Sequence, residues 1–220
     1  MILLALTDIH DDFAGIPKIA ADLEAADLVI LAGDLTNFGH KPAAERVLQA
    51  VTRFARRILA VPGNCDYPDI ASHLDDLGVS LHGKCETIDG VAFVGIGGSL
   101  PAPGATPFEF SETELGRILT KASGDLGSHL PLVLVAHQPP FRTMSDQIHT
   151  GEHVGSTAIR SFIEERRPLI CFTGHIHEAA GIDMLDQTRL VNPGPFGKGG
   201  YAYAELENEV LRLEIRHWRG

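Results

Sequence analysis

The stretch Gly174-His175-Ile176-His177 follows the apolar run Leu169-Ile170-Cys171-Phe172. A short apolar run of this kind predicts a buried strand. Residues two positions apart on an extended chain point to the same side, so the end of this strand should present two imidazoles side by side. Gly174 allows a tight turn beneath them. The stretch therefore predicts a metal chelate.

Four other apolar runs end in a small turn and a polar residue. The runs and the polar residues after them are Leu3–Leu6 with Asp8 and His10, Leu28–Leu31 with Gly33-Asp34, Ile58–Val61 with Gly63-Asn64, and Leu132–Val135 with His137. Parallel strands bring their carboxyl ends to one edge of a sheet. Five predicted strands would thus deliver seven metal-competent side chains to one rim.

Length and composition favour one soluble domain. The chain has 220 residues, of which 44% are hydrophobic and 6% aromatic, which fits a single domain over residues 1–220 with a mainly aliphatic core. No apolar run approaches the roughly 18 residues of a membrane span. The first strand begins without a basic flank or a cleavage site. We expect a cytoplasmic protein with no membrane partner.

Charge and cysteine content exclude several classes of protein. The formal net charge of −11 argues against broad attraction to extended nucleic acid or to anionic membranes. An anionic substrate stays compatible with it, because bound cations reverse the sign of a local field. The three cysteines are odd in number and lack C-x-x-C spacing, so they predict neither a disulfide framework nor a zinc ribbon.

The order of predicted elements indicates an α/β fold. Predicted helices over 17–25 and 41–57 separate the first three strands, which favours parallel strands with right-handed crossovers. Asp89-Gly90 joins a predicted hairpin, and Ser111 with Glu114 forms a capping box that begins another helix. A helix over 156–166 and strands over 182–185, 189–191, 201–206 and 210–215 follow. Two sheets packed face to face, with helices outside, accommodate this order.

The donor set predicts two metal ions. The seven side chains are Asp8, His10, Asp34, Asn64, His137, His175 and His177. They supply carboxylate, amide oxygen and imidazole, which suit Mn, Fe, Zn, Co or Ni, and manganese is the metal we favour. Seven donors exceed one tetrahedral zinc but fit two divalent ions bridged by one carboxylate. Such a pair activates a bridging water as hydroxide for in-line attack at phosphorus.

The ordered motifs resemble those of the calcineurin-like metallophosphoesterases. They are Asp8-x-His10, Gly33-Asp34, Gly63-Asn64-Cys65-Asp66, His137 and Gly174-His175-x-His177. The wider sequence is similar to uncharacterised predicted archaeal and bacterial phosphoesterases. The resemblance implies a four-layer α/β/β/α sandwich of two mixed sheets flanked by helices. It also implies that Asp8, His10, Asp34 and His177 hold the first metal, that Asp34, Asn64, His137 and His175 hold the second, and that Asp34 bridges them.

Cys65 departs from the commonest form of the pattern, which has histidine directly after the asparagine. A neutral thiol is a poor substitute for an imidazolium as proton donor. We therefore expect a phosphodiesterase rather than a phosphomonoesterase, with aryl esters also favoured over alkyl monoesters. A loop histidine, His149 or His153, is the alternative donor to the leaving group.

Several loop residues are candidates for contact with the substrate. Arg142, His149 and His153 follow His137 in a long loop, and Asn37 and His40 follow Asp34. An ordinary exposed loop is the competing interpretation. Asp66 either orients a neighbour or caps the next helix.

The predicted function is metal-dependent hydrolysis of a small phosphoester. A catalytically weak scaffold or regulatory protein on the same fold is the alternative, and the complete ligand set favours the enzyme. A nuclease lacks an evident basic track. The physiological substrate and the metal used in the cell stay open. A homo-oligomer is compatible with the sequence.

Overall fold

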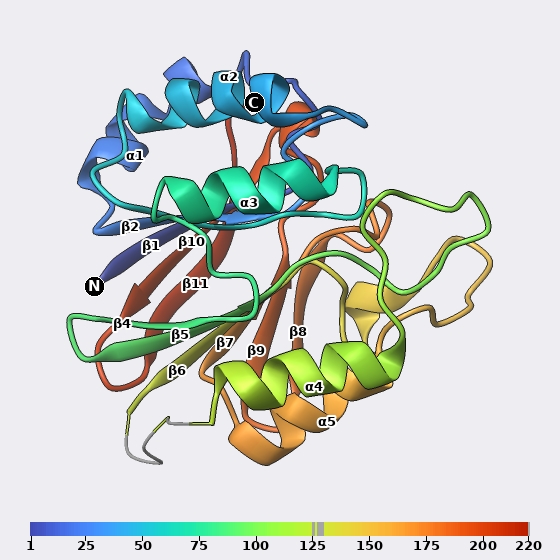
Figure 1. Ribbon diagram of the computed structural model, residues 1–220. Coiled ribbons are helices and arrows are strands. Elements are labelled where there is room, and N and C mark those ends of the chain that lie inside the picture. The colour runs from blue at the N-terminus through green and yellow to red at the C-terminus, as the bar shows by residue number, and fades with distance from the viewer. Residues whose placement is uncertain (125, 127–129, 220) are drawn as a thin grey trace.

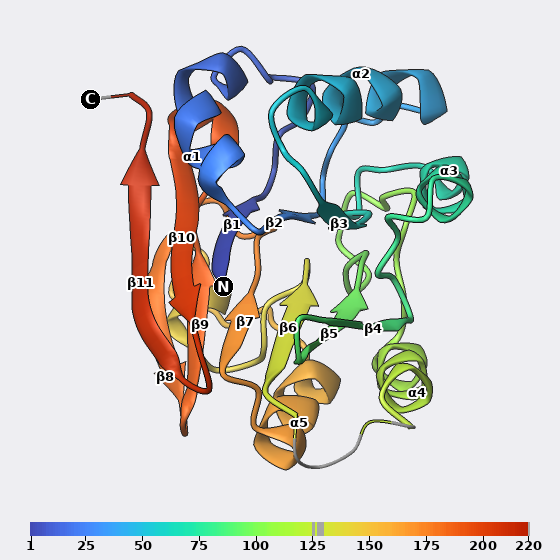
Figure 2. The same cartoon turned by 90° about the vertical axis from the view of Figure 1, so that its left-hand side faces the viewer.

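The computed structural model describes residues 1–124, 126 and 130–219. Two mixed β-sheets pack face to face and helices cover both outer faces, which makes a four-layer α/β/β/α sandwich (Figures 1 and 2). The fold is the one that the sequence predicts.

The first sheet has the strand order β11-β10-β1-β2-β3. Its strands are β1 (Ile2–Leu6), β2 (Leu28–Ala32), β3 (Ile58–Val61), β10 (Gly200–Leu206) and β11 (Val210–His217). The pairs β1/β2 and β2/β3 are parallel, whereas β10 is antiparallel to both of its neighbours. The helices α1 (Ala20–Ala25), α2 (Lys41–Thr52) and α3 (Pro68–Asp76) cover its outer face.

The second sheet has the strand order β4-β5-β6-β7-β9-β8. Its strands are β4 (Cys85–Ile88), β5 (Val91–Ile96), β6 (Leu132–Ala136), β7 (Ile170–Phe172), β8 (Gly181–Leu185) and β9 (Thr188–Asn192). The helices α4 (Glu112–Ala122) and α5 (Thr157–Arg166) cover its outer face, as Figure 1 shows. Three short 3₁₀ turns, Ile16–Ile19, Met144–Asp146 and Phe196–Lys198, lie in the connections.

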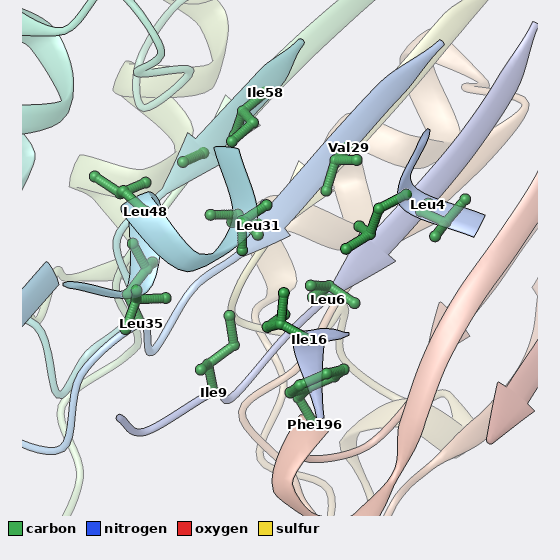
Figure 3. Packing of buried hydrophobic residues seen from close by; sticks show 14 of the residues in the cluster. Leu4, Leu6, Ile9, Ile16, Val29, Leu31, Leu35, Leu48, Ile58 and Phe196 are labelled. Carbon is green, nitrogen blue, oxygen red and sulfur yellow. The ribbon is translucent and has the colours of Figure 1, made fainter. Parts of the chain in front are cut away.

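The apolar runs are continuous because the central strands are buried on both faces. In β1, Leu4 and Leu6 face the covering helices, whereas Leu3 and Ala5 face the second sheet. Figure 3 shows the layer beneath the helices, where Leu31 and other aliphatic side chains gather. A strand buried on both faces carries no polar residue until it ends, so its first polar side chains lie at the sheet edge.

One predicted helix is shorter than expected. The pattern over 41–57 predicts a helix to Arg57, but α2 ends at Thr52. The carbonyl of Arg57 accepts the N–H of Val29 in β2 at 3.0 Å, and β3 begins at the next residue. The chain must therefore leave the helix before Arg57, and Phe54 and Ala55 pack against the core outside the helix. Among the described residues, no helix has the length and apolar character needed to cross a bilayer.

Candidate metal centre

The predicted donors lie at the carboxyl ends of β1, β2, β3, β6 and β7. Asp8, His10, Asp34 and His175 have left-handed backbone conformations, with φ of 51°, 47°, 49° and 66°. Non-glycine residues adopt this conformation at a cost, and such strain is concentrated at functional sites. Here it turns the chain sharply at the strand ends, where Asp8 N–H donates to Gly33 O at 3.0 Å.

Two glycines let the strand ends approach one another. A Cβ atom on Gly33, which has a φ of +97°, would lie 2.2 Å from Nδ1 of His137. A Cβ atom on Gly63 would lie 2.0 Å from Oδ1 of Asp34. Both distances are far shorter than any real contact, so only glycine permits the two sheets to close around these side chains.

The first group of donors contains Asp8, His10 and His177. The Nε2 atoms of His10 and His177 are 3.3 Å apart, and Nε2 of His177 is 3.3 Å from Oδ1 of Asp8. Nε2 of His10 lies 3.6 Å from Oδ2 of Asp34. Donor atoms of Asp8, His10 and His177 all fall within 4.8 Å of one another, which suits a single ion.

The second group contains Asn64, His137 and His175. Nε2 of His137 lies 3.0 Å from Oδ1 of Asn64 and 3.5 Å from Oδ2 of Asp34. The centroids of the His137 and His175 rings are 5.3 Å apart. Asp34 therefore approaches donors of both groups, with its Oδ2 3.6 Å from Nε2 of His10 and 3.5 Å from Nε2 of His137. Asp8 also lies near both histidines, with its carboxylate 3.9 Å from Nε2 of His10 and within 4.8 Å of a ring nitrogen of His137.

His175 and His177 belong to different groups, which corrects the expectation that they form one chelate side by side. The left-handed φ of His175 breaks the extended geometry on which that expectation depends. His175 lies against His137, whereas His177 lies against His10 and Asp8.

The hydrogen bonds of His137 test whether a cation fits. Nδ1 of His137 lies 2.8 Å from Ala32 O, to which it donates. A neutral ring then has a lone pair on Nε2, and this lone pair faces the oxygens of Asn64 and Asp34. Nε2 of His137, Oδ1 of Asn64 and Oδ2 of Asp34 each present a lone pair, so they repel one another unless a proton or a metal ion lies between them. The residues present thus fit a divalent cation.

The pKa shifts reflect the same crowding of donors. Burial favours the neutral form of Asp34, but attraction to His137 and His10 outweighs burial and holds the pKa of Asp34 well below its usual value. Burial also opposes the charge on His137, but Asp34 and Asp8 raise the pKa of His137 to about 9. Burial, with repulsion from His137, lowers the pKa of His175 to about 4. His175 therefore offers a neutral imidazole at neutral pH.

Asp66 forms hydrogen bonds with the two loops that carry Asp34 and Asn64. Its buried carboxylate accepts the backbone N–H groups of Leu35, Thr36 and Gly63 at 3.1, 2.9 and 2.8 Å, and the hydroxyl of Thr36 at 2.7 Å. Helix α3 begins after Tyr67 without a side-chain cap. Of the two roles left open by the sequence, orientation of neighbours is confirmed and helix capping is wrong.

Thr7 is a supporting residue that sequence reasoning missed. Its hydroxyl donates to Oδ2 of Asp8 at 2.8 Å and is buried. A threonine at the end of a strand is common, so no sequence pattern indicated that Thr7 supports Asp8.

Cys65 lies beside the donors. Its side chain is buried, its backbone N–H donates to Oδ1 of Asp34 at 2.8 Å, and its Sγ lies within 4.8 Å of donor atoms of His10 and Asp34. Burial and the nearby carboxylate of Asp34 raise the pKa of the Cys65 thiol far above its ordinary value. The thiol is neutral at neutral pH.

The loop residues predicted to contact substrate are exposed and held by other partners. His149 pairs with Glu178, His153 with the buried Asp146, and His40 with Asp69. The Arg142 guanidinium lies over the ring of Phe141, and the backbone N–H of Asn37 donates to Asp11. Among the described residues, none of these five side chains forms a hydrogen bond or ion pair with the seven donors.

The chain is similar to known proteins in sequence and in fold. An uncharacterized protein of Methanocaldococcus jannaschii is 34% identical over 215 residues, which are 96% of this chain and 95% of the relative. The structure of TT1561 of Thermus thermophilus has a TM-score of 0.77 at 21% identity and covers 99% of both chains. A dimetal phosphatase from Danio rerio has a TM-score of 0.64 at 12% identity, covering 99% of this chain and 96% of that one.

At these identities the two solved structures establish the fold alone. The family assignment comes from the sequence. The sequence model of one family, the calcineurin-like phosphoesterases, matches residues 1–179, and this range includes every donor described above. The chain belongs to the calcineurin-like phosphoesterase family.

Proposed function

We propose that this protein hydrolyses small phosphoesters with two divalent metal ions, for which manganese is the favoured identity. The observation that carries the proposal is the completeness of the donor set. All seven predicted donors are present: Asp34 lies against His10 and His137, His177 lies against Asp8, and Asn64 and the ring of His175 lie against His137. A scaffold on this fold has no need of a full donor set in which Asp8, Asp34, Asn64 and His137 are buried. The similarity in fold to a dimetal phosphatase supports the same function.

In this proposal Asp8, His10, Asp34 and His177 hold one ion, and Asp34, Asn64, His137 and His175 hold the other. Two such ions supply Lewis acidity that favours loss of a proton from water and neutralises phosphoryl charge. Asp34 sets the spacing of the pair because its carboxylate lies between His10 and His137. His137 is oriented by its bond to Ala32 O, and Asp8 by the hydroxyl of Thr7.

Cys65 determines which leaving groups are tolerated. Its neutral, buried thiol lies near the donors, where it is too weak an acid to protonate an alkoxide efficiently. An aryl ester, whether a monoester or a diester, releases a phenoxide, which needs less protonation than an alkoxide. We therefore propose a phosphodiesterase that also accepts aryl monoesters and turns over alkyl monoesters poorly.

The exposed loop residues would contact the remainder of the substrate. His149 is held by Glu178, the residue directly after His177, so it lies at the rim of the centre. Arg142 and His153 belong to the same loop, which is anchored by the buried Asp146. Asn37 and His40 belong to the loop after Asp34. These five side chains are our candidates for binding phosphate or the alcohol groups of the substrate.

A substrate panel with defined metals tests the proposal. The protein loaded with manganese is assayed on a bis-aryl phosphodiester, an aryl monoester, an alkyl monoester, a cyclic nucleotide and single-stranded nucleic acid. We expect the bis-aryl diester and the aryl monoester to be hydrolysed fastest, and the Asp34→Asn variant to be inactive on all of them. Activity on none of them, with two manganese ions retained, would favour the scaffold.

A further inference from the structure

Strand β11 is an open edge of the first sheet. It runs for eight residues and, among the described residues, pairs with β10 alone at the end of the strand order of the sheet. In Figure 2 it lies at the outer left side of the molecule. A long edge strand presents unpaired backbone groups, which proteins often protect with proline or with charged side chains. Residues 210–217 contain no proline, and their charged residues, Arg212, Glu214 and Arg216, are of both signs.

The free backbone groups of this edge can be identified from the hydrogen-bond pattern. The N–H of Trp218, just after β11, donates to Gly199 O, just before β10, at 3.0 Å. In an antiparallel pair the backbone groups of successive residues point alternately toward and away from the partner strand. Counting back from Trp218 along the continuous register, the N–H and C=O groups of Leu213 and Ile215 point away from β10.

The same side of the sandwich leaves apolar side chains uncovered. Leu213 and Ile215 face the space between the sheets and are only partly buried there. Leu211 is 52% exposed, and β8, the edge of the second sheet, contributes Ile182 and Met184 at 42% and 52%. Ile182 pairs with Val191, which belongs to the layer between the sheets, so β8 turns Ile182 toward the same space. We call Leu213, Ile215, Ile182 and Met184 the open side. Leu211 lies at the register shift of β11, beside this surface.

The charges on the other face of β11 are self-complementary. Arg212 and Glu214 alternate with the apolar residues. Within the chain they pair at 2.9 Å, and Glu214 also pairs with Arg216, but the Arg212 and Glu214 side chains are still 52% and 32% exposed, which leaves part of each charge open to a second chain. Two copies of β11 placed antiparallel about a twofold axis at Leu213 would set Arg212 of each copy opposite Glu214 of the other. An axis at Glu214 would instead set Arg212 opposite Arg216, and Glu214 opposite itself. Like charges directly opposite are destabilising, so the axis at Glu214 is disfavoured. An axis at Ile215 would set Glu214 opposite Arg216, but it would also set Leu213 opposite His217. The axis at Leu213, which sets Leu213 opposite Leu213, is therefore favoured.

That register also satisfies the backbone. Leu213 would lie opposite its own copy, and its outward N–H and C=O would bond to those of the copy in both directions, as a twofold interface requires. Leu211 would lie opposite Ile215 of the other copy. Backbone, apolar residues and charges thus select the same arrangement.

We propose that a second copy of this chain occupies the β11 edge, and that the two first sheets join into one continuous sheet through antiparallel pairing centred at Leu213. The pairing places aliphatic residues of each copy against the open side of the other. It is independent of the metal centre, which lies at the strand ends.

Sedimentation and light scattering of the 220-residue chain test the pairing. We expect twice the 23.7 kDa mass of one chain. Arg212→Glu and Glu214→Arg each place like charges opposite each other at two symmetric positions, and each should raise the dimer dissociation constant by about 10-fold or more. Arg117→Glu on α4, an exposed charge reversal elsewhere, should leave the dimer intact.

Mixing the two single variants gives the sharpest result. One variant chain has two acids at positions 212 and 214 and the other has two arginines, so a mixed pair is complementary at both positions. We expect an equal mixture to recover the dimer that each variant alone loses. Circular dichroism and thermal unfolding verify that both variants fold.

Three results would overturn the proposal. These are a wild-type monomer at about 100 µM, a dimer that neither charge reversal weakens, and a mixture that does not recover it. Hydrogen exchange supplies a separate measure, since the amides of Leu213 and Ile215 should be protected in the dimer and exchange faster in the charge-reversed variants. Equal exchange rates of these two amides in the wild type and in the charge-reversed variants would also contradict the pairing.

Discussion

The Nε2 atoms of His10 and His177 lie 3.3 Å apart, although 167 positions separate the two residues in the chain. They come from the ends of β1 and β7, which belong to different sheets. The contact therefore spans the interface between the two sheets. The metal centre therefore depends on the packing of the two sheets. The apolar layer between the sheets fixes the distance between the strand ends that carry these two rings.

Replacing His177 with alanine should remove one donor from the first group. We expect a lower manganese content and a fall in kcat/KM that exceeds the roughly 10–100-fold cost of losing a residue that supports a ligand. Elemental analysis and steady-state kinetics measure the two effects. His217→Ala, an exposed histidine on β11, is the matched control and should keep both values.

Asp66→Asn should destabilise the fold. The amide presents one oxygen and one NH₂ group to four donors, so at least one buried N–H or hydroxyl loses its acceptor. We expect a loss of about 2–4 kcal/mol in the free energy of unfolding, measured in urea on the metal-free protein. Asp75→Asn, which affects an exposed pair with Lys84, should change it by less than about 1 kcal/mol. Equal losses of unfolding free energy in the two variants would show that the buried hydrogen bonds of Asp66 contribute no more than an exposed ion pair.

Glu112 should make stability depend on pH. Partial burial opposes its charge, but the hydroxyl of Ser156 and the N–H groups of Thr157 and Ala158 outweigh burial and lower the pKa of Glu112. A lowered pKa in the folded state gives stability that is present above the ordinary value of about 4.5 and is lost as the pH falls through the folded value.

The Glu112→Gln variant tests this dependence. It should be less stable than the wild type by about 1 kcal/mol at pH 7, and the difference should shrink below about pH 4. Urea unfolding at several pH values measures it. A difference that stays constant with pH would mean that the charge on Glu112 contributes nothing.

Cys65→His should broaden the range of leaving groups. An imidazolium beside the centre would donate a proton that the neutral thiol does not, so the rate on an alkyl monoester should rise relative to an aryl monoester by about 10-fold or more. Cys85→Ser, on β4 and outside the centre, should leave this ratio unchanged. An unchanged ratio in Cys65→His would mean that a loop histidine, rather than position 65, serves the leaving group.

The sequence predicts the strands and the donor residues because both follow from burial. Continuous apolar runs such as Leu28–Ala32 must lie between two layers, and the polar residues after them must then lie at a sheet edge. The distribution of donors between two groups does not follow from this pattern. It depends on the left-handed backbone of His175, which directs its ring to His137 while His177 meets His10.

Other features depend on contacts between distant parts of the chain. Helix α2 ends before Arg57 because the carbonyl of Arg57 pairs with Val29 of β2. The role of Asp66 depends on backbone groups of Thr36 in another loop. The open edge at β11 depends on which strands are neighbours, which the residues of β11 alone do not specify. Local sequence patterns carry no information on such pairings.

Elemental analysis of protein loaded with manganese and freed of unbound metal tests the central claim, that Asp34 joins two groups of donors into one dinuclear centre. We predict about two manganese ions per chain in the wild type and a clear loss in Asp34→Asn, which keeps the shape of the side chain but removes its charge. A wild-type protein that retains no manganese, or an Asp34→Asn variant that retains as much as the wild type, would contradict it.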